Sequence, residues 1–106
     1  MQEQLICGKT PEEIQELKNK HGHLVLGEVK QGEKTYHAIF KEPTFKVLEA
    51  TGSVSKSSEI KGTIALYDNC VVVADEAFKG RDFLKLKAVE CLAHYMNSFS
   101  VSVKNL

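Results

Sequence analysis

The stretch Asp82–Asn97, DFLKLKAVECLAHYMN, is the longest periodic segment of this chain. Its apolar residues recur at three- and four-residue steps, which predicts an amphipathic helix with Asp82 as its N-cap. On a helical wheel they cover an arc of about 200°, wider than the roughly 100° stripe of a helix that rests on one surface. They are Leu84, Ala88, Val89, Cys91, Leu92, Ala93, Tyr95 and Met96. We therefore expect this helix to be central and covered on more than one side.

One flank of this helix is a candidate protein-contact surface. Its residues are Val89, Ala93 and Met96, followed by Phe99 just beyond the helix. Either other helices of the same chain enclose this flank or a second chain does. In the second case, Met96→Asp combined with Val89→Asp would turn an oligomer into a monomer without unfolding it.

Residues 24–30 and 34–41 are rich in β-branched and aromatic side chains and predict an antiparallel hairpin. A two-residue turn at Gln31–Gly32 would place Tyr36 opposite Gly27. Apolar side chains occur on both faces of this hairpin. One face is therefore expected to pack on the long helix, and the other needs a second cover.

A helix is predicted from Pro11, because Thr10 can cap it, Glu13 can complete a capping box, and Gly22 supplies the stop. Its apolar side is only Ile14 and Leu17, so this helix should lie on the outside.

Thr44 marks the start of a second helix that is expected to bury Phe45 and Leu48 and to end at Gly52. A polar loop over 53–58 and a third helix over Glu59–Asn69 follow. Gly62 within that helix weakens it by about 1 kcal/mol relative to alanine.

Two segments remain open from the residues alone. The first is Val71–Val73, which fits either a short strand that joins the hairpin sheet or an extended connector. The acidic pair after it, Asp75–Glu76, is expected to be a solvated turn. The segment 98–106 alternates with period two, like a strand, yet its apolar residues also fit a helical stripe. The predicted fold is a single α+β domain over 1–106, with three to four helices on a small antiparallel sheet and the long helix central.

The composition excludes several classes of function. Fourteen basic and fourteen acidic residues balance, so no charge excess favours binding to nucleic acid. The sequence has no apolar run long enough for a membrane helix and no signal-peptide pattern, so we expect a cytoplasmic protein. Its three cysteines are odd in number and widely spaced, which favours free thiols.

No catalytic, cofactor or metal site is predicted. Cys91 and His94 are one helical turn apart and could bind zinc with Cys70 or His37, but Cys91 belongs to the apolar line and His94 to the polar one. The segment Gly52–Ser57 lacks the glycine that precedes the lysine of a phosphate-binding loop. We therefore expect a protein that is not an enzyme.

The order of several motifs resembles a family of small phage and prophage proteins, the tail assembly chaperones. These motifs are TPEEIQELKNKHG, the hairpin, YHAIFKEPT before a helix, the helix that ends in Asp68-Asn69-Cys70, the acidic pair Asp75-Glu76 and the long helix. The resemblance covers Thr10 to about Met96. This chain departs from the family by having Val71 in place of a tryptophan, Val73–Ala74 in place of glycines, and Ser-Phe-Ser-Val in place of a charged end.

The resemblance implies that the chain binds the long helical tape measure protein and keeps it soluble until tail tube subunits replace the chaperone. It also implies self-association along one client. The alternative hypothesis is a small structural or regulatory interaction domain unrelated to tails, which binds its partner through the hairpin edge or the first helix.

Overall fold

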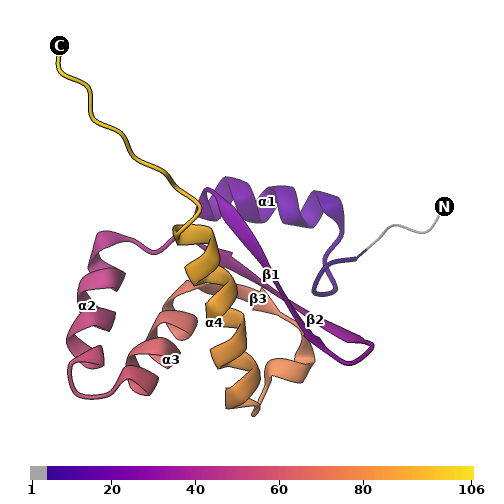
Figure 1. The fold of residues 1–106 in the computed structure, drawn as a ribbon. Helices are drawn as coiled ribbons and strands as arrows, with labels where there is room; N and C mark the ends of the chain where they lie inside the picture. The colour runs from indigo at the N-terminus through magenta and orange to yellow at the C-terminus, as the bar shows by residue number, and fades with distance from the viewer. Residues whose placement is uncertain (1–4) are drawn as a thin grey trace.

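The computed structural model describes residues 5–106 and has an α+β fold, as predicted (Figure 1). Four helices and one 3-10 turn accompany a three-stranded antiparallel sheet in this part of the chain. The elements are α1 (Pro11–His21), β1 (Leu24–Gln31), β2 (Lys34–Lys41), α2 (Phe45–Ser55), α3 (Glu59–Cys70), β3 (Val71–Ala74), η1 (Glu76–Phe78) and α4 (Asp82–Met96). The strand order is β1-β2-β3, so residues 71–74 do join the hairpin sheet.

The hairpin turn lies one residue later than predicted. Gln31 pairs with Lys34, so Gly32 and Glu33 are the two turn residues. Gly32 has φ 61° and Glu33 does not have a positive φ, the pattern of a type II′ turn that needs glycine at its first central position. Gly27 therefore pairs with Ala38, and Tyr36 pairs with Val29. This two-residue change in register leaves every side chain on its predicted face.

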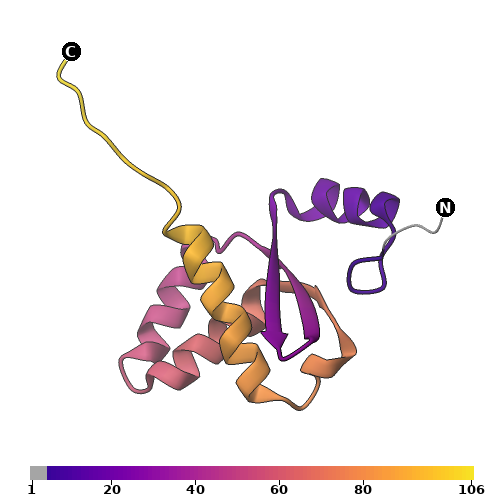
Figure 2. The ribbon, with the colours of Figure 1, turned by 45° about the vertical axis from the view of Figure 1, so that its right-hand side comes forward.

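The pair Gly27–Ala38 forms the surface on which α4 crosses the sheet. A Cβ on Gly27 would lie 3.1 Å from the Cβ of Cys91 and 3.2 Å from Phe40 Cε2, so a side chain here would push α4 or the Phe40 ring away by a few tenths of an ångström. α4 contacts β1 on one side and α3 on the other, as Figure 2 shows. The long helix is therefore central, as its wide apolar arc predicted.

The hydrophobic core lies between α4, α3 and one face of the sheet. Its largest fully buried side chains are Phe40, Phe78, Leu92 and Cys70. Tyr67 packs edge-on against Phe40 and stacks on Phe78, with ring centroids 5.8 and 6.3 Å apart. These contacts join β2, α3 and η1 into one core.

The opposite face of the sheet has only partial cover. The N-terminal segment and α1 lie on this side, and a hollow of about 220 Å³ remains between them and the sheet. Its lining residues are Ile6, Ile14, Lys18, Leu24, Leu26 and Ile39. α1 begins with the predicted capping box of Thr10 and Glu13, ends at Gly22, and buries no residue. The second cover of the hairpin is thus a loosely packed, outer helix.

Three predictions about helix ends and helix faces were wrong. Arg81, not Asp82, is the N-cap of α4, and it makes no side-chain capping bond. α2 continues through Ser55, so the polar loop is limited to 56–58, because the last turn of α2 packs on α3, where Ser55 lies against Gly62. α2 buries Thr51, while Phe45 and Leu48 are 79% and 46% exposed.

The segment after α4 contains no regular secondary structure, so neither the strand nor the helix expected for 98–106 is present. Both views show it leaving the body of the molecule at the end of α4 (Figures 1 and 2). Its apolar side chains Phe99, Val101 and Val103 are 63%, 95% and 93% exposed.

Candidate functional site

The predicted contact residues occupy three different environments. Val89 is 7% exposed and belongs to the core, so it is not part of a free surface. Ala93 and Met96 are half-buried, whereas Phe99 is exposed. The structure thus separates Val89 from the other three, whose role in protein contact stays a prediction.

Met96 and Phe99 line a groove where the end of α4 meets the start of α2. The volume of this groove is about 280 Å³, and its other lining residues are Glu42, Pro43, Leu48 and Tyr95. The exposed side of α2, with Leu48, borders it, so the residues that were expected to be buried instead extend its apolar surface.

Tyr95 fixes the wall of this groove through three neighbours. Its ring stacks on His23 at 5.8 Å and meets Phe99 edge-on at 5.3 Å. Its hydroxyl donates a hydrogen bond to the Glu42 carboxylate, and this bond raises the pKa of Tyr95. The groove therefore combines apolar side chains with one carboxylate at its edge, and its wall joins α4 to the segment between β2 and α2.

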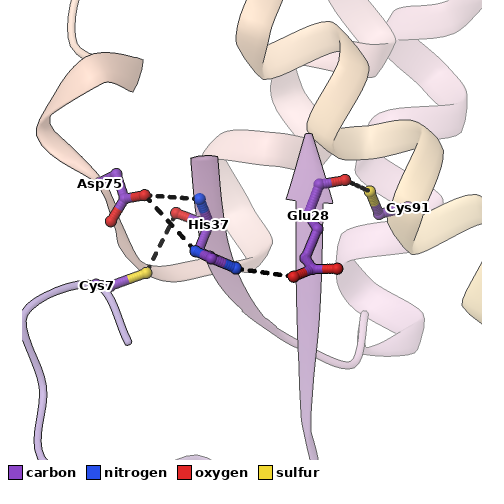
Figure 3. A network of polar contacts seen from close by, with 5 residues as sticks. All are labelled: Cys7, Glu28, His37, Asp75 and Cys91. Atoms are coloured by element: carbon purple, nitrogen blue, oxygen red, sulfur yellow. Dashed lines mark hydrogen bonds and ion pairs between the residues drawn. The ribbon is translucent and has the colours of Figure 1, made fainter. Parts of the chain in front are cut away.

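A second cluster of polar side chains lies at the other side of the sheet, where His37 of β2 is placed between two carboxylates (Figure 3). The His37 backbone N–H donates to Asp75 Oδ2 at 2.7 Å, and its ring Nε2 lies 2.9 Å from Glu28 Oε1. The Cys7 thiol donates to the His37 carbonyl oxygen at 3.2 Å. Asp75 is therefore a partner of β2 rather than a solvated turn residue, a role that depends on the pairing of β3 with β2.

This cluster lacks the geometry of nucleophilic catalysis. The Cys7 thiol bonds to a backbone carbonyl and not to the His37 ring, and burial together with the Asp75 charge raises its pKa to about 11. A thiol with a raised pKa is a poor nucleophile near neutral pH. What the contacts do is join the N-terminal segment, β2 and β3.

The side chains considered as zinc ligands lie in different environments and do not form one site. Cys70 is fully buried in the core, the Cys91 thiol donates to the Glu28 carbonyl oxygen at 3.3 Å, and His94 is exposed. Within residues 5–106, no group of three or more His, Cys, Asp or Glu side chains is placed to hold a metal ion. In the same range, no helix is both long and apolar enough to span a membrane.

Comparisons with protein-family models, with curated proteins and with solved structures found no match for this chain.

Proposed function

We propose that this chain is a non-enzymatic protein-binding factor that holds an apolar helical segment of a client in the groove between α2 and the end of α4. The observation that carries the proposal is the exposed apolar surface around this groove, formed by Leu48, Met96 and Phe99. The resemblance of the motif order to tail assembly chaperones supplies the client class, the phage tape measure protein. The site of action is then the cytoplasm of the host cell.

The dimensions of the groove suit a protein segment. Its volume of about 280 Å³ lies just below the roughly 300–1,000 Å³ typical of small-molecule sites. Amphipathic helices bind such shallow grooves through apolar side chains at positions i, i+3 and i+4, with affinity from burial rather than from charge. Phe45, 79% exposed on the first turn of α2, adds apolar surface from the same helix.

Co-expression with the tape measure protein encoded nearby tests this proposal. We expect the wild-type chain to recover the client in a soluble complex, and Leu48→Asp to reduce recovery at least about tenfold, because a charge in the groove must be desolvated on binding. Phe83→Asp is the matched control: Phe83 is 69% exposed at the opposite end of α4, so the same change there should leave recovery unchanged.

Three results would count against the proposal: an insoluble client with nothing co-purified, equal loss in both variants, or no loss in Leu48→Asp. The alternative of an interaction domain unrelated to tails is favoured by one observation, the apolar hollow beneath α1. Leu26 is 46% exposed at this hollow, so Leu26→Asp tests whether the hollow binds a partner. Loss of partner binding in Leu26→Asp but not in Leu48→Asp would assign binding to the α1 side.

A further inference from the structure

The outer edge of β3 is an unpaired strand edge without the usual protection against self-association. The sheet order makes β1 and β3 its two edges within the described residues. β1 carries the exposed charges Glu28 and Lys30, a common device that keeps edges from pairing. β3 is Val71-Val72-Val73-Ala74, which contains neither charge nor proline, and all four residues are only half-buried. This edge therefore has the composition of a strand that receives a partner.

A groove of about 280 Å³ follows this edge. All four residues of β3 and Asp75 line it, with Tyr67 and Phe78 supplying aromatic surface and Lys79 and Lys85 the basic rim. The register with β2 skips Val72, which has no partner on that strand. A groove along an open edge provides what strand addition requires: backbone groups for hydrogen bonds and pockets for alternate side chains.

The segment 100–104, Ser-Val-Ser-Val-Lys, has the complementary pattern. Val101 and Val103 alternate with serines, and both are more than 90% exposed. As an added strand, this segment would place both valines toward the groove and the serines toward solvent. Residues 100–103 carry no charged side chain and neither does β3, so pairing them would bury no unpaired charge.

Direction and reach favour a second copy as the source of this strand. The segment leaves the body at the end of α4 in both views and makes no pairing with its own sheet (Figures 1 and 2). Phe99 packs on Tyr95, so the free segment begins at residue 100. Extended at about 3.3 Å per residue, residues 100–104 span roughly 17 Å, enough to pair along the four residues of β3 in a neighbouring copy.

We propose that copies of this chain associate head to tail, with residues 100–104 of one copy pairing as a strand with the outer edge of β3 of the next. Such a contact joins two different surfaces, so it either closes into a ring, of which a reciprocal exchange between two copies is the smallest, or continues as an open chain of copies. The proposal does not depend on the client groove, because neither strand includes a residue that lines it.

Mass in solution over a concentration series tests the contact with the full chain. We expect the wild-type mass to rise above the 11.8 kDa of one chain as the concentration increases. Val101→Asp with Val103→Asp should weaken association at least tenfold, and so should Val72→Lys in β3. Ser100→Asp with Ser102→Asp, which adds the same charges on the outward side, should change it less than twofold. The tail variants lie outside the folded body, so their effect is separable from unfolding.

Mixing the two defective variants gives the sharpest result. The tail variant keeps an intact β3 edge and the Val72→Lys variant keeps an intact tail, so each should be monomeric alone and the mixture should form a one-to-one complex that grows no further. The proposal would be overturned by a wild-type chain that stays monomeric at all concentrations or by a mixture that does not associate. Equal disruption by the serine and valine variants would also overturn it.

Discussion

Cys7 shows how a single side chain ties the N-terminal segment to the sheet. Cys7 has φ 53° and Gly8 φ 75°, and Ile6 and Lys9 exchange two backbone hydrogen bonds of 3.0 and 2.9 Å across them. Two left-handed residues in succession form the tightest kind of hairpin turn, which is uncommon for a residue other than glycine, asparagine or aspartate. This turn presents the Cys7 thiol to the His37 carbonyl oxygen.

The raised pKa of Cys7 predicts a specific loss of stability at high pH. The thiol titrates near 9.0 when unperturbed and near 11 in the fold. Between these values the unfolded chain releases a proton that the folded chain keeps, so the stabilisation is complete below about pH 9 and is lost as the pH rises toward about 11. We expect urea unfolding to show a steeper decline for the wild type than for Cys7→Ser over this window. Parallel declines would mean that the thiol is not buried.

Among the helices, the packing of α3 against α2 depends on one glycine, Gly62. A Cβ on Gly62 would lie 1.8 Å from Ser55 Oγ and 3.0 Å from Ser55 Cα, so any side chain there meets the backbone of α2. Gly62 is buried at this crossing, although glycine weakens a helix. The packing of α2 against α3 that Gly62 permits offsets the low helix propensity of glycine.

Two glycine-to-alanine changes should therefore have opposite effects on the free energy of unfolding. Gly62→Ala is expected to lose about 1–3 kcal/mol, because the overpacking exceeds the gain in helix propensity. Gly52→Ala, in α2 with no atom within 4 Å of the added Cβ, should gain up to about 1 kcal/mol. Urea unfolding of the two variants measures both values, and a stabilised Gly62→Ala would show that α2 is free to move away.

The sequence predicted those features of the helices and strands that neighbouring residues encode, and it did not predict those that depend on packing between distant segments. Thr10 and Glu13 cap α1 as expected, since a capping box is encoded within four residues. The hairpin pattern was equally local, but its register depended on which residues form the turn, and Gly32 occupies the first central position. The exposure of Phe45 and Leu48 was not predictable, because it depends on which side of α2 meets α3.

In the whole molecule, α4 joins the sheet to α3, and Val89 is one of the α4 residues that belong to the core. We therefore expect Val89→Asp to unfold the protein, with a loss of at least about 3 kcal/mol, because it buries a charge without a partner. Phe99→Asp should change the free energy of unfolding by less than about 0.5 kcal/mol, since Phe99 is exposed. A folded Val89→Asp variant in urea unfolding would contradict this core position.

This position changes the outcome first expected for Val89→Asp with Met96→Asp. We expected the double variant to dissociate without unfolding if this flank contacts a second chain. Because Val89 is buried, the expected result is now global unfolding. The contact surface that we propose is therefore limited to Met96, Phe99 and the exposed side of α2, which border one groove.

The late position of α4 in the chain also has a consequence during synthesis. The face of the sheet that holds Phe40 and Ala38 is complete once β3 has been made, but α4 closes it only after Met96 has emerged from the ribosome. Until then the nascent chain exposes apolar surface and an open strand edge, the features that make partly folded chains aggregate. The apolar face of the sheet is thus covered only when the fifteen-residue helix α4 has formed and packed on it.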